Sequence, residues 1–220
     1  TGRPDQWLPK DQWLGNARIG YKNDALNIWN SFNYLDENIY SYGAVFNDVA
    51  GDQTYITHRY TDQLQADWKI NSRLSLNSSL SYQHLQRRTL STLFTESTGQ
   101  VHLNPDPAAD QALVKFSDAF FRSAASWYIS SKVSLQPGVE VQWDKAFGDR
   151  IDGEPTITNY AFFVSSEIKP IDGINIRPGI RFLHNTVYPA PKAVPSINTK
   201  FRLSDNFDLR LSYGYGYRAP

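Results

Sequence analysis

The 220-residue sequence predicts an all-β fold, a partial transmembrane antiparallel up-and-down β-barrel with about ten strands in five hairpins. Three observations predict this fold. Apolar and polar residues alternate with a period of two, short and long connections alternate along the chain, and aromatic residues gather near the expected strand ends. Aromatic residues make up 14% of the chain although its mean hydropathy is -0.50, which is unusual for a packed soluble core.

The first two hairpins show the alternation most clearly. In residues 13–22 every second residue is apolar or small, and Asn23-Asp24 makes a turn into residues 26–34. In the second hairpin residues 63–70 lead through a polar turn into residues 74–82, where Leu and Tyr alternate with Ser and Asn. Each of these segments has one apolar and one polar face, as half-buried strands do.

Three further hairpins repeat this pattern. They pair residues 125–129 with 135–143, residues 160–168 with 174–182, and residues 197–201 with 209–213. Within every hairpin the connection is a few residues long and contains Ser, Asn, Asp, Pro or Gly, which are typical turn residues. No segment of useful length has helical periodicity.

The connections between hairpins are much longer than the turns within them. We expect them at residues 36–53, 86–112, 145–156 and 184–193. Short turns at one rim and long loops at the other are typical of outer-membrane barrels. A soluble antiparallel sandwich is the simpler alternative, but it does not explain why the long loops always fall on one rim.

Composition excludes several classes of function. The 22 basic and 22 acidic residues balance, so we expect no nucleic-acid partner. The absence of cysteine excludes a disulfide framework and a thiol nucleophile. No apolar run is long enough for a membrane helix, and no hydrolase, P-loop or metalloprotease motif is present, so the chain is not expected to be an enzyme and no cofactor is predicted.

The C-terminal segments carry a resemblance to a known family. Residues 191–203 and 206–220 have a proline, a strand, a short turn, a second strand, and then glycine and tyrosine before Arg218, Ala219 and Pro220. This pattern resembles the barrel of TonB-dependent outer-membrane receptors, and its style is similar to receptors of the Bacteroidetes. The resemblance implies a bacterial outer-membrane location and a plugged barrel of roughly 22 strands. Residues 1–220 would then form part of one barrel, without the N-terminal plug domain and the later strands.

The resemblance also implies a function and partners. It implies TonB-coupled import of a scarce nutrient of the iron–siderophore, haem or cobalamin class. The implied partners are outer-membrane lipid, the chain's own plug domain, TonB acting through that plug, and the imported small molecule. A passive porin-like or adhesin barrel and a soluble β-sandwich binding module remain alternatives.

Two groups of residues are candidates for a functional site. In an external loop Tyr40, Tyr42 and Phe46 could stack on a flat ligand, although packing among the loops themselves is the simpler interpretation. If the ligand is haem, His84, His102 and His184 could ligate its iron from the long-loop rim, although solvated histidines are commoner. Aspartates of the long loops could bind calcium, but they lack a full calcium-loop pattern, and no metal site is predicted. The arginines expected to face the lumen and the plug are Arg177, Arg181, Arg202 and Arg210.

Overall fold

One antiparallel sheet forms from the alternating segments. The computed structural model describes residue 3, residues 8–149 and residues 151–216. Within these residues it contains eleven strands, which are β1 (Lys10–Lys22), β2 (Leu26–Ser41), β3 (Val49–Lys69), β4 (Leu74–Thr95), β5 (Gln100–Leu103), β6 (Leu113–Tyr128), β7 (Val133–Phe147), β8 (Thr156–Ile168), β9 (Ile174–Asn185), β10 (Ala193–Ser204) and β11 (Phe207–Gly214).

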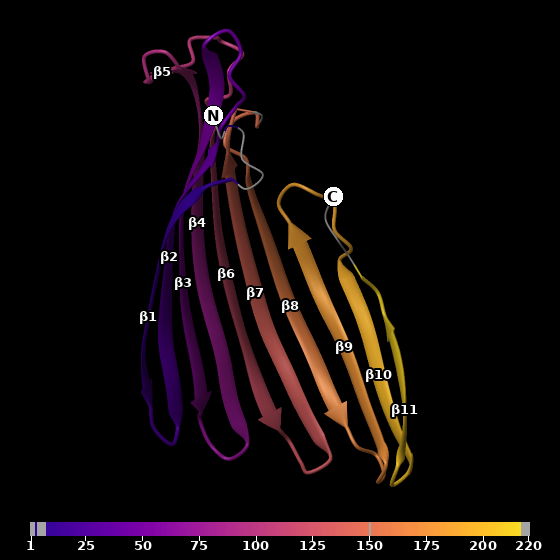
Figure 1. The fold of residues 1–220 in the computed structure, drawn as a ribbon. Coiled ribbons are helices and arrows are strands. Elements are labelled where there is room, and N and C mark those ends of the chain that lie inside the picture. Colours follow the sequence, from indigo (N-terminus) through magenta and orange to yellow (C-terminus); the bar gives the residue numbers. More distant parts are fainter. Residues whose placement is uncertain (1–2, 4–7, 150, 217–220) are drawn as a thin grey trace.

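Each long strand pairs with its neighbours in the chain. The strand order is β1-β2-β3-β4-β6-β7-β8-β9-β10-β11, and the short β5 lies off this path and pairs with β4. Figure 1 shows a single open sheet with the tight turns at one rim and the longer connections at the other. The predicted up-and-down arrangement of ten strands in five hairpins is therefore confirmed.

The predicted lengths of two connections are wrong. Residues 36–53 and 86–112 were expected to be loops, but β2 continues to Ser41, β3 already begins at Val49, β4 continues to Thr95, and β5 lies inside the second segment. The backbone ladder needs no apolar side chains, and near this rim polar residues such as Asp36 and His58 face each other across the strands. The period-two signal fades there although the pairing does not.

Side chains of the turns hold the short-turn rim in shape. This rim comprises residues 23–25, 70–73, 129–132, 169–173 and 205–206, which connect the hairpin strands. Asn23 Oδ1 accepts hydrogen bonds from the backbone N–H of Ala25 at 2.9 Å and of Leu26 at 2.7 Å. Asn71 Oδ1 does the same for Arg73 and Leu74, at 2.8 and 2.9 Å. These side chains satisfy backbone donors that the ladder leaves free.

The register divides the side chains into an apolar face and a polar face. On the apolar face Trp68 lies opposite Leu76, Leu64 opposite Leu80, and Val139 opposite Phe162. On the polar face the same strands carry Gln63, Gln65 and Asp67 opposite Ser81, Ser79 and Asn77. Because successive residues point to opposite sides, this division follows directly from the pairing.

The sheet has almost no hydrophobic core. Among the described residues Ala50 and Ala161 are the only buried apolar ones, whereas many large apolar side chains of the apolar face are exposed, including Trp68, Trp127 and Phe182. A soluble sandwich would bury such a face against a second layer. The described residues form one layer, so the β-sandwich alternative is wrong. They contain no helix long and apolar enough to cross a bilayer.

A glycine in β7 makes room for an aromatic ring on the polar face. Gly138 lies opposite Phe163 of β8, and a Cβ atom at Gly138 would lie 2.2 Å from Cζ of that ring. The ring also lies under the guanidinium of Arg122, at 5.2 Å from its centroid. The ring therefore fits flat over the backbone only because residue 138 has no side chain.

We predict that Gly138→Ala displaces the Phe163 ring and destabilises the folded barrel. The expected loss is about 1–2 kcal/mol, because a methyl group inserted into a filled site costs this much. Urea unfolding of the full-length protein in lipid vesicles measures it. Gly51→Ala, at a strand glycine with open space around it, is the matched control. The double variant Gly138→Ala/Phe163→Ala should regain part of the loss; equal stability of Gly138→Ala and wild type would contradict the role of this glycine.

Candidate functional site

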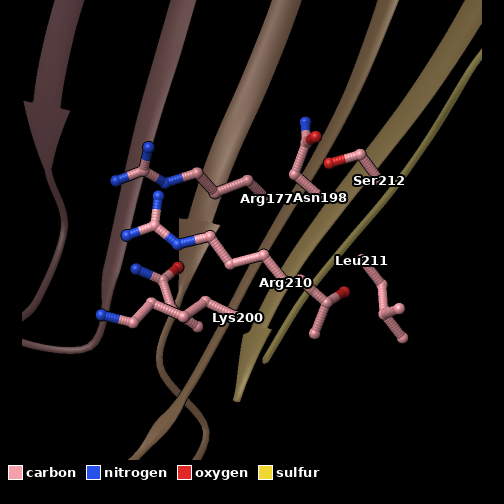
Figure 2. A pocket seen from close by; sticks show the side chains of 8 residues that line it. Arg177, Asn198, Lys200, Arg210, Leu211 and Ser212 are labelled. Atoms are coloured by element: carbon pink, nitrogen blue, oxygen red, sulfur yellow. The ribbon is translucent and has the colours of Figure 1, made fainter. Parts of the chain in front are cut away.

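A basic cluster lies on the polar face of the last three strands. It consists of Arg177 in β9, Lys200 in β10 and Arg210 in β11. Lys200 lies directly opposite Arg210, and the neighbouring residue pair across β9 and β10 is Arg177 and Asn198. Figure 2 shows the three cationic side chains extending in the same direction from adjacent strands. They line a hollow of about 450 Å³ together with Asn175, Asn198, Thr199, Leu211 and Ser212.

Carboxylates neutralise only part of this positive charge. Glu167 of β8 is paired with Arg177 at 3.3 Å and with Lys169 at 3.5 Å. Asp208 is paired with Lys200 at 2.8 Å and more distantly with Arg202 at 3.9 Å. Two carboxylates thus serve four cations, and within the described residues no ion pair within 4 Å involves Arg210. The cluster therefore presents a net positive surface.

A second ion network lies further along the same face. Glu140 of β7 is only 8% exposed and lies between two arginines. Arg122 approaches it at 3.4 Å, and Arg181 of β9 donates a hydrogen bond to its other oxygen. A buried carboxylate is stable as an ion only when it is paired and hydrogen-bonded in this way. Glu140 thereby links β6, β7 and β9 across the polar face.

A pocket opens at the long-loop rim, which comprises residues 42–48, 96–112, 148–155 and 186–192. This mouth pocket has a volume of about 600 Å³ and lies between residues 106–112 on one side and Gly148, Asp149 and Ile151 on the other. Its apolar wall includes Val114, Ala109 and Ile151, and its acidic groups are Asp106, Asp110 and Asp149. Leu113 of β6 faces the apolar side. The next residue, Val114, therefore faces the polar side, and the pocket that it lines opens on the polar face.

Local hydrogen bonds shape one wall of the mouth pocket. The side-chain amide of Gln111 imitates a strand residue, since its Nε2 donates to Ser91 O at 2.8 Å and its Oε1 accepts from Ser91 N at 3.2 Å. Asp106 Oδ1 accepts from Ala108 N at 2.9 Å, and Asp110 Oδ1 accepts from Ala112 N at 3.0 Å. Within the described part of the chain no hydrogen bond engages the second carboxylate oxygen of Asp106 or of Asp110. No group of metal-ligating side chains suited to a metal ion occurs in the part of the chain that the structure describes.

Comparison with known proteins identifies the family. The family model for the TonB dependent receptor-like beta-barrel matches residues 2–220. The chain belongs to this family. Its members are outer-membrane transporters and receptors, so the chain is a bacterial outer-membrane protein whose apolar face meets lipid and whose polar face lines the lumen. In these barrels the short turns are periplasmic and the long loops are extracellular.

Solved outer-membrane receptors are similar to this chain, and the first of them shares its fold. The ferric preacinetobactin receptor BauA from Acinetobacter baumannii aligns with a TM-score of 0.57 and 14% identity, covering 88% of this chain and 35% of that chain. The ferric enterobactin receptor from Pseudomonas aeruginosa aligns with a TM-score of 0.49 and 10% identity, covering 97% of this chain and 45% of that chain. The present chain thus spans less than half the length of either receptor. A search of curated proteins found no match.

Most of the aromatic and histidine candidates do not lie in loops. Only Tyr42 and Phe46 do, whereas Tyr40 lies in β2 opposite Thr54. His84 lies within β4, His102 in β5 and His184 in β9. The predicted loop placement of those four residues is therefore wrong. The strands continue further towards the long-loop rim than the apolar pattern indicated. Contact of the six residues with a ligand stays a prediction.

The aromatic candidates form part of a packed external rim. The rings of Tyr40 and Tyr42 stack at 6.1 Å with 7° between their planes. A hydrogen bond from Tyr40 to Asp11, at 3.0 Å, raises the pKa of the tyrosine. Arg3 lies over the Tyr42 ring at 4.8 Å and forms an ion pair with the buried Asp52. Phe46 is 77% exposed at a two-residue turn and is the ring most accessible to a ligand.

Two of the three histidines face the wrong way for a ligand in the lumen. His84 lies opposite Tyr60, in the series of the apolar face, and its Nδ1 is 2.8 Å from Ser117 Oγ. His184 lies opposite Tyr160 on the same face, and the two rings are stacked at 6.2 Å. Sequence spacing placed these residues near the rim but did not settle the face, which needs the register. His102 is exposed beside Gln100, at 3.1 Å.

The four predicted lumen arginines all lie on the polar face. Arg177 lies opposite Asn198, Arg181 opposite Val194, Arg202 opposite Asp208, and Arg210 opposite Lys200. Their role toward a plug domain stays a prediction. Arg218, Ala219 and Pro220 lie outside the described residues. The sequence had suggested Asp106, Asp110 and Asp149 only as calcium ligands, because nothing in their spacing shows that Asp149, 39 or more positions further along the chain, meets the other two at one pocket.

Proposed function

We propose that this chain forms part of the wall of a TonB-coupled importer that captures a scarce nutrient at its extracellular rim. The mouth pocket would receive the ligand, and the basic cluster of the lumen wall would hold the plug domain. The observation that carries this proposal is the separation of these two sites along one polar face. The pocket lies at the loop rim, and the cluster lies near the periplasmic ends of β9, β10 and β11.

The mouth pocket suits a small ligand with hydrogen-bond donors. Its volume is in the range of sites for small molecules, which lies at roughly 300–1,000 Å³. The apolar wall would bury hydrophobic surface, and the carboxylates of Asp106, Asp110 and Asp149 would accept N–H or O–H groups. These features favour an iron–siderophore or a cobalamin over haem. Haem carries two carboxylates of its own, and none of the described residues that line the pocket is a histidine.

The basic cluster suits a partner with carboxylates on its surface. Cationic side chains that point in parallel into the lumen repel one another unless an anionic partner lies between them. Water is partly excluded in a plugged lumen, which strengthens the attraction between guanidinium and carboxylate groups. A plug domain with acidic residues opposite β9–β11 would satisfy them, and its withdrawal would expose the charged wall to the ligand's path.

We predict that uptake by this receptor requires TonB. Cells that carry the full-length protein in place of their own receptor should accumulate radiolabelled ferric siderophore or cobalamin, and the accumulation should vanish in a strain without TonB. The physical reason is that a lumen filled by a plug opens only when work is done on the plug. Equal uptake with and without TonB would support the passive channel and contradict this proposal.

We predict that Ala109→Trp lowers the affinity of the receptor for its ligand. The indole would fill the mouth pocket, and we expect a loss of about ten-fold, or ~1.4 kcal/mol. Concentration-dependent uptake measures the change. Ala108→Trp is the matched control, because Ala108 is exposed next to the pocket but does not line it. If both variants take up ligand with wild-type affinity, the ligand does not bind in this pocket.

We predict that the variant Arg177→Gln/Lys200→Gln/Arg210→Gln holds the plug less firmly. Planar bilayers should then show an increase in channel conductance of about ten-fold for the full-length receptor, because about 1–2 kcal/mol of charge-assisted hydrogen bonding is lost. The control Lys22→Gln/Arg73→Gln/Lys132→Gln removes the same charge from exposed positions of the short-turn rim. A triple variant as tightly closed as the control would contradict the role of the basic cluster.

A further inference from the structure

The apolar face changes character abruptly towards the extracellular rim. A row of aromatic residues crosses this face, with Tyr82 in β4, Trp143 in β7 and Tyr160 in β8, and Phe147 of β7 lies beyond it. On the same face, His84 lies two residues beyond Tyr82, and Lys145 lies two residues beyond Trp143. Aromatic rings prefer the level of the headgroups at a membrane surface, so this row indicates where the hydrocarbon ends.

Three cations follow one another just beyond the aromatic row, and we call them the outward basic cluster. Lys145 lies opposite Ser117, Lys115 lies opposite Gln86 and Phe147, and Arg88 lies opposite Leu113. Each is therefore the diagonal neighbour of the next on adjacent strands β4, β6 and β7, at a distance of roughly 7–8 Å between Cα atoms. The register places all three on the lipid-facing side, in the same series as Leu80, Phe121 and Val141.

The protein itself supplies little negative charge to this cluster. Glu154 forms an ion pair with Lys145, and this hydrogen bond and the charges of Lys145 and Lys115 lower the pKa of Glu154. Lys115 Nζ lies 5.7 Å from the Phe147 ring centroid. Neither Arg88 nor Lys115 has an ion pair within 4 Å among the described residues. Two outward carboxylates of β2 and β3, Asp36 and Asp62, bond to His58 and Asn30.

We propose that the outward basic cluster of Arg88, Lys115 and Lys145 binds the phosphate groups of a phosphorylated lipid in the outer leaflet. The apolar face below the cluster would contact the acyl chains, while the guanidinium and ammonium groups donate hydrogen bonds to phosphate oxygens. The positive charge of the cluster favours an anionic lipid. Because the cluster lies directly beyond the aromatic row, it favours a lipid headgroup over a soluble anion. Glu154 would compete with the phosphate for Lys145. This proposal rests on family membership and not on the imported ligand.

Lipid retention by the full-length receptor tests the proposal. The protein is purified in mild detergent with bis-phosphorylated lipid A or with the same lipid after its phosphates are removed, and bound lipid is counted by native mass spectrometry. We expect Arg88→Gln/Lys115→Gln/Lys145→Gln to retain about ten-fold less phosphorylated lipid than the wild type. Glu154→Gln should retain about two-fold more, because Lys145 is released. The dephosphorylated lipid should show neither difference.

Two controls separate this site from other effects. Arg177→Gln/Lys200→Gln/Arg210→Gln removes the same charge from the lumen face and should leave lipid retention unchanged, whereas the outward variant should leave TonB-dependent uptake intact. Heat-modifiable gel mobility reports whether each barrel is folded. Wild-type retention by the folded outward variant, equal binding of the dephosphorylated lipid, full competition by inorganic phosphate, or a change in oligomeric state in place of lipid loss would each overturn the proposal.

Discussion

The hydrogen bonding of the strands to their neighbours is the constraint on which the rest of this structure depends. A sheet with one face in lipid has no water there to satisfy backbone N–H and C=O groups, so every strand needs a partner on each side. Within the described residues every long strand except β1 and β11 has a partner on both sides, and each pairs with its neighbours along the chain. Stability thus comes from the ladder and the lipid, which explains why the described residues bury almost no apolar side chains.

The pairing of the strands decides which face of the sheet each side chain lies on. It therefore also decides which charged residues lie on the lumen face and which on the lipid face. Glu140 and Arg181 form an ion pair on the lumen side. Lys115 and Lys145 are diagonal neighbours on the lipid side, beyond the aromatic row. A shift of one residue in any strand would exchange these sets and place charge in hydrocarbon. The lumen pairs and the outward lysines therefore also act as register markers, since only one pairing leaves all of them in polar surroundings.

The sequence predicted what depends on local periodicity and missed what depends on pairing between distant segments. The five hairpins and their turns follow from alternation and from turn residues such as Asn23 and Asn71, whose side chains cap the backbone. The extension of β2, β3 and β4 towards the long-loop rim could not be predicted, because the alternation of apolar and polar residues fades there. The faces of His84 and His184 needed the register, and the mouth pocket needed the positions of two loops that the sequence does not relate.

The mouth pocket arises where β4 changes its partner. Along one edge β4 pairs with β6 from Leu74 to Arg88 and with β5 from Thr92 to Thr95. Between these stretches Thr89 N donates to Ala112 O, and the Gln111 amide and Asn104 N satisfy Ser91. The backbone groups of β4 in this stretch therefore have hydrogen-bond partners although no strand lies beside them. Residues 104–112 can then bulge outward around the pocket. Residues 104–112 can therefore vary while the ladder that forms the barrel wall stays intact.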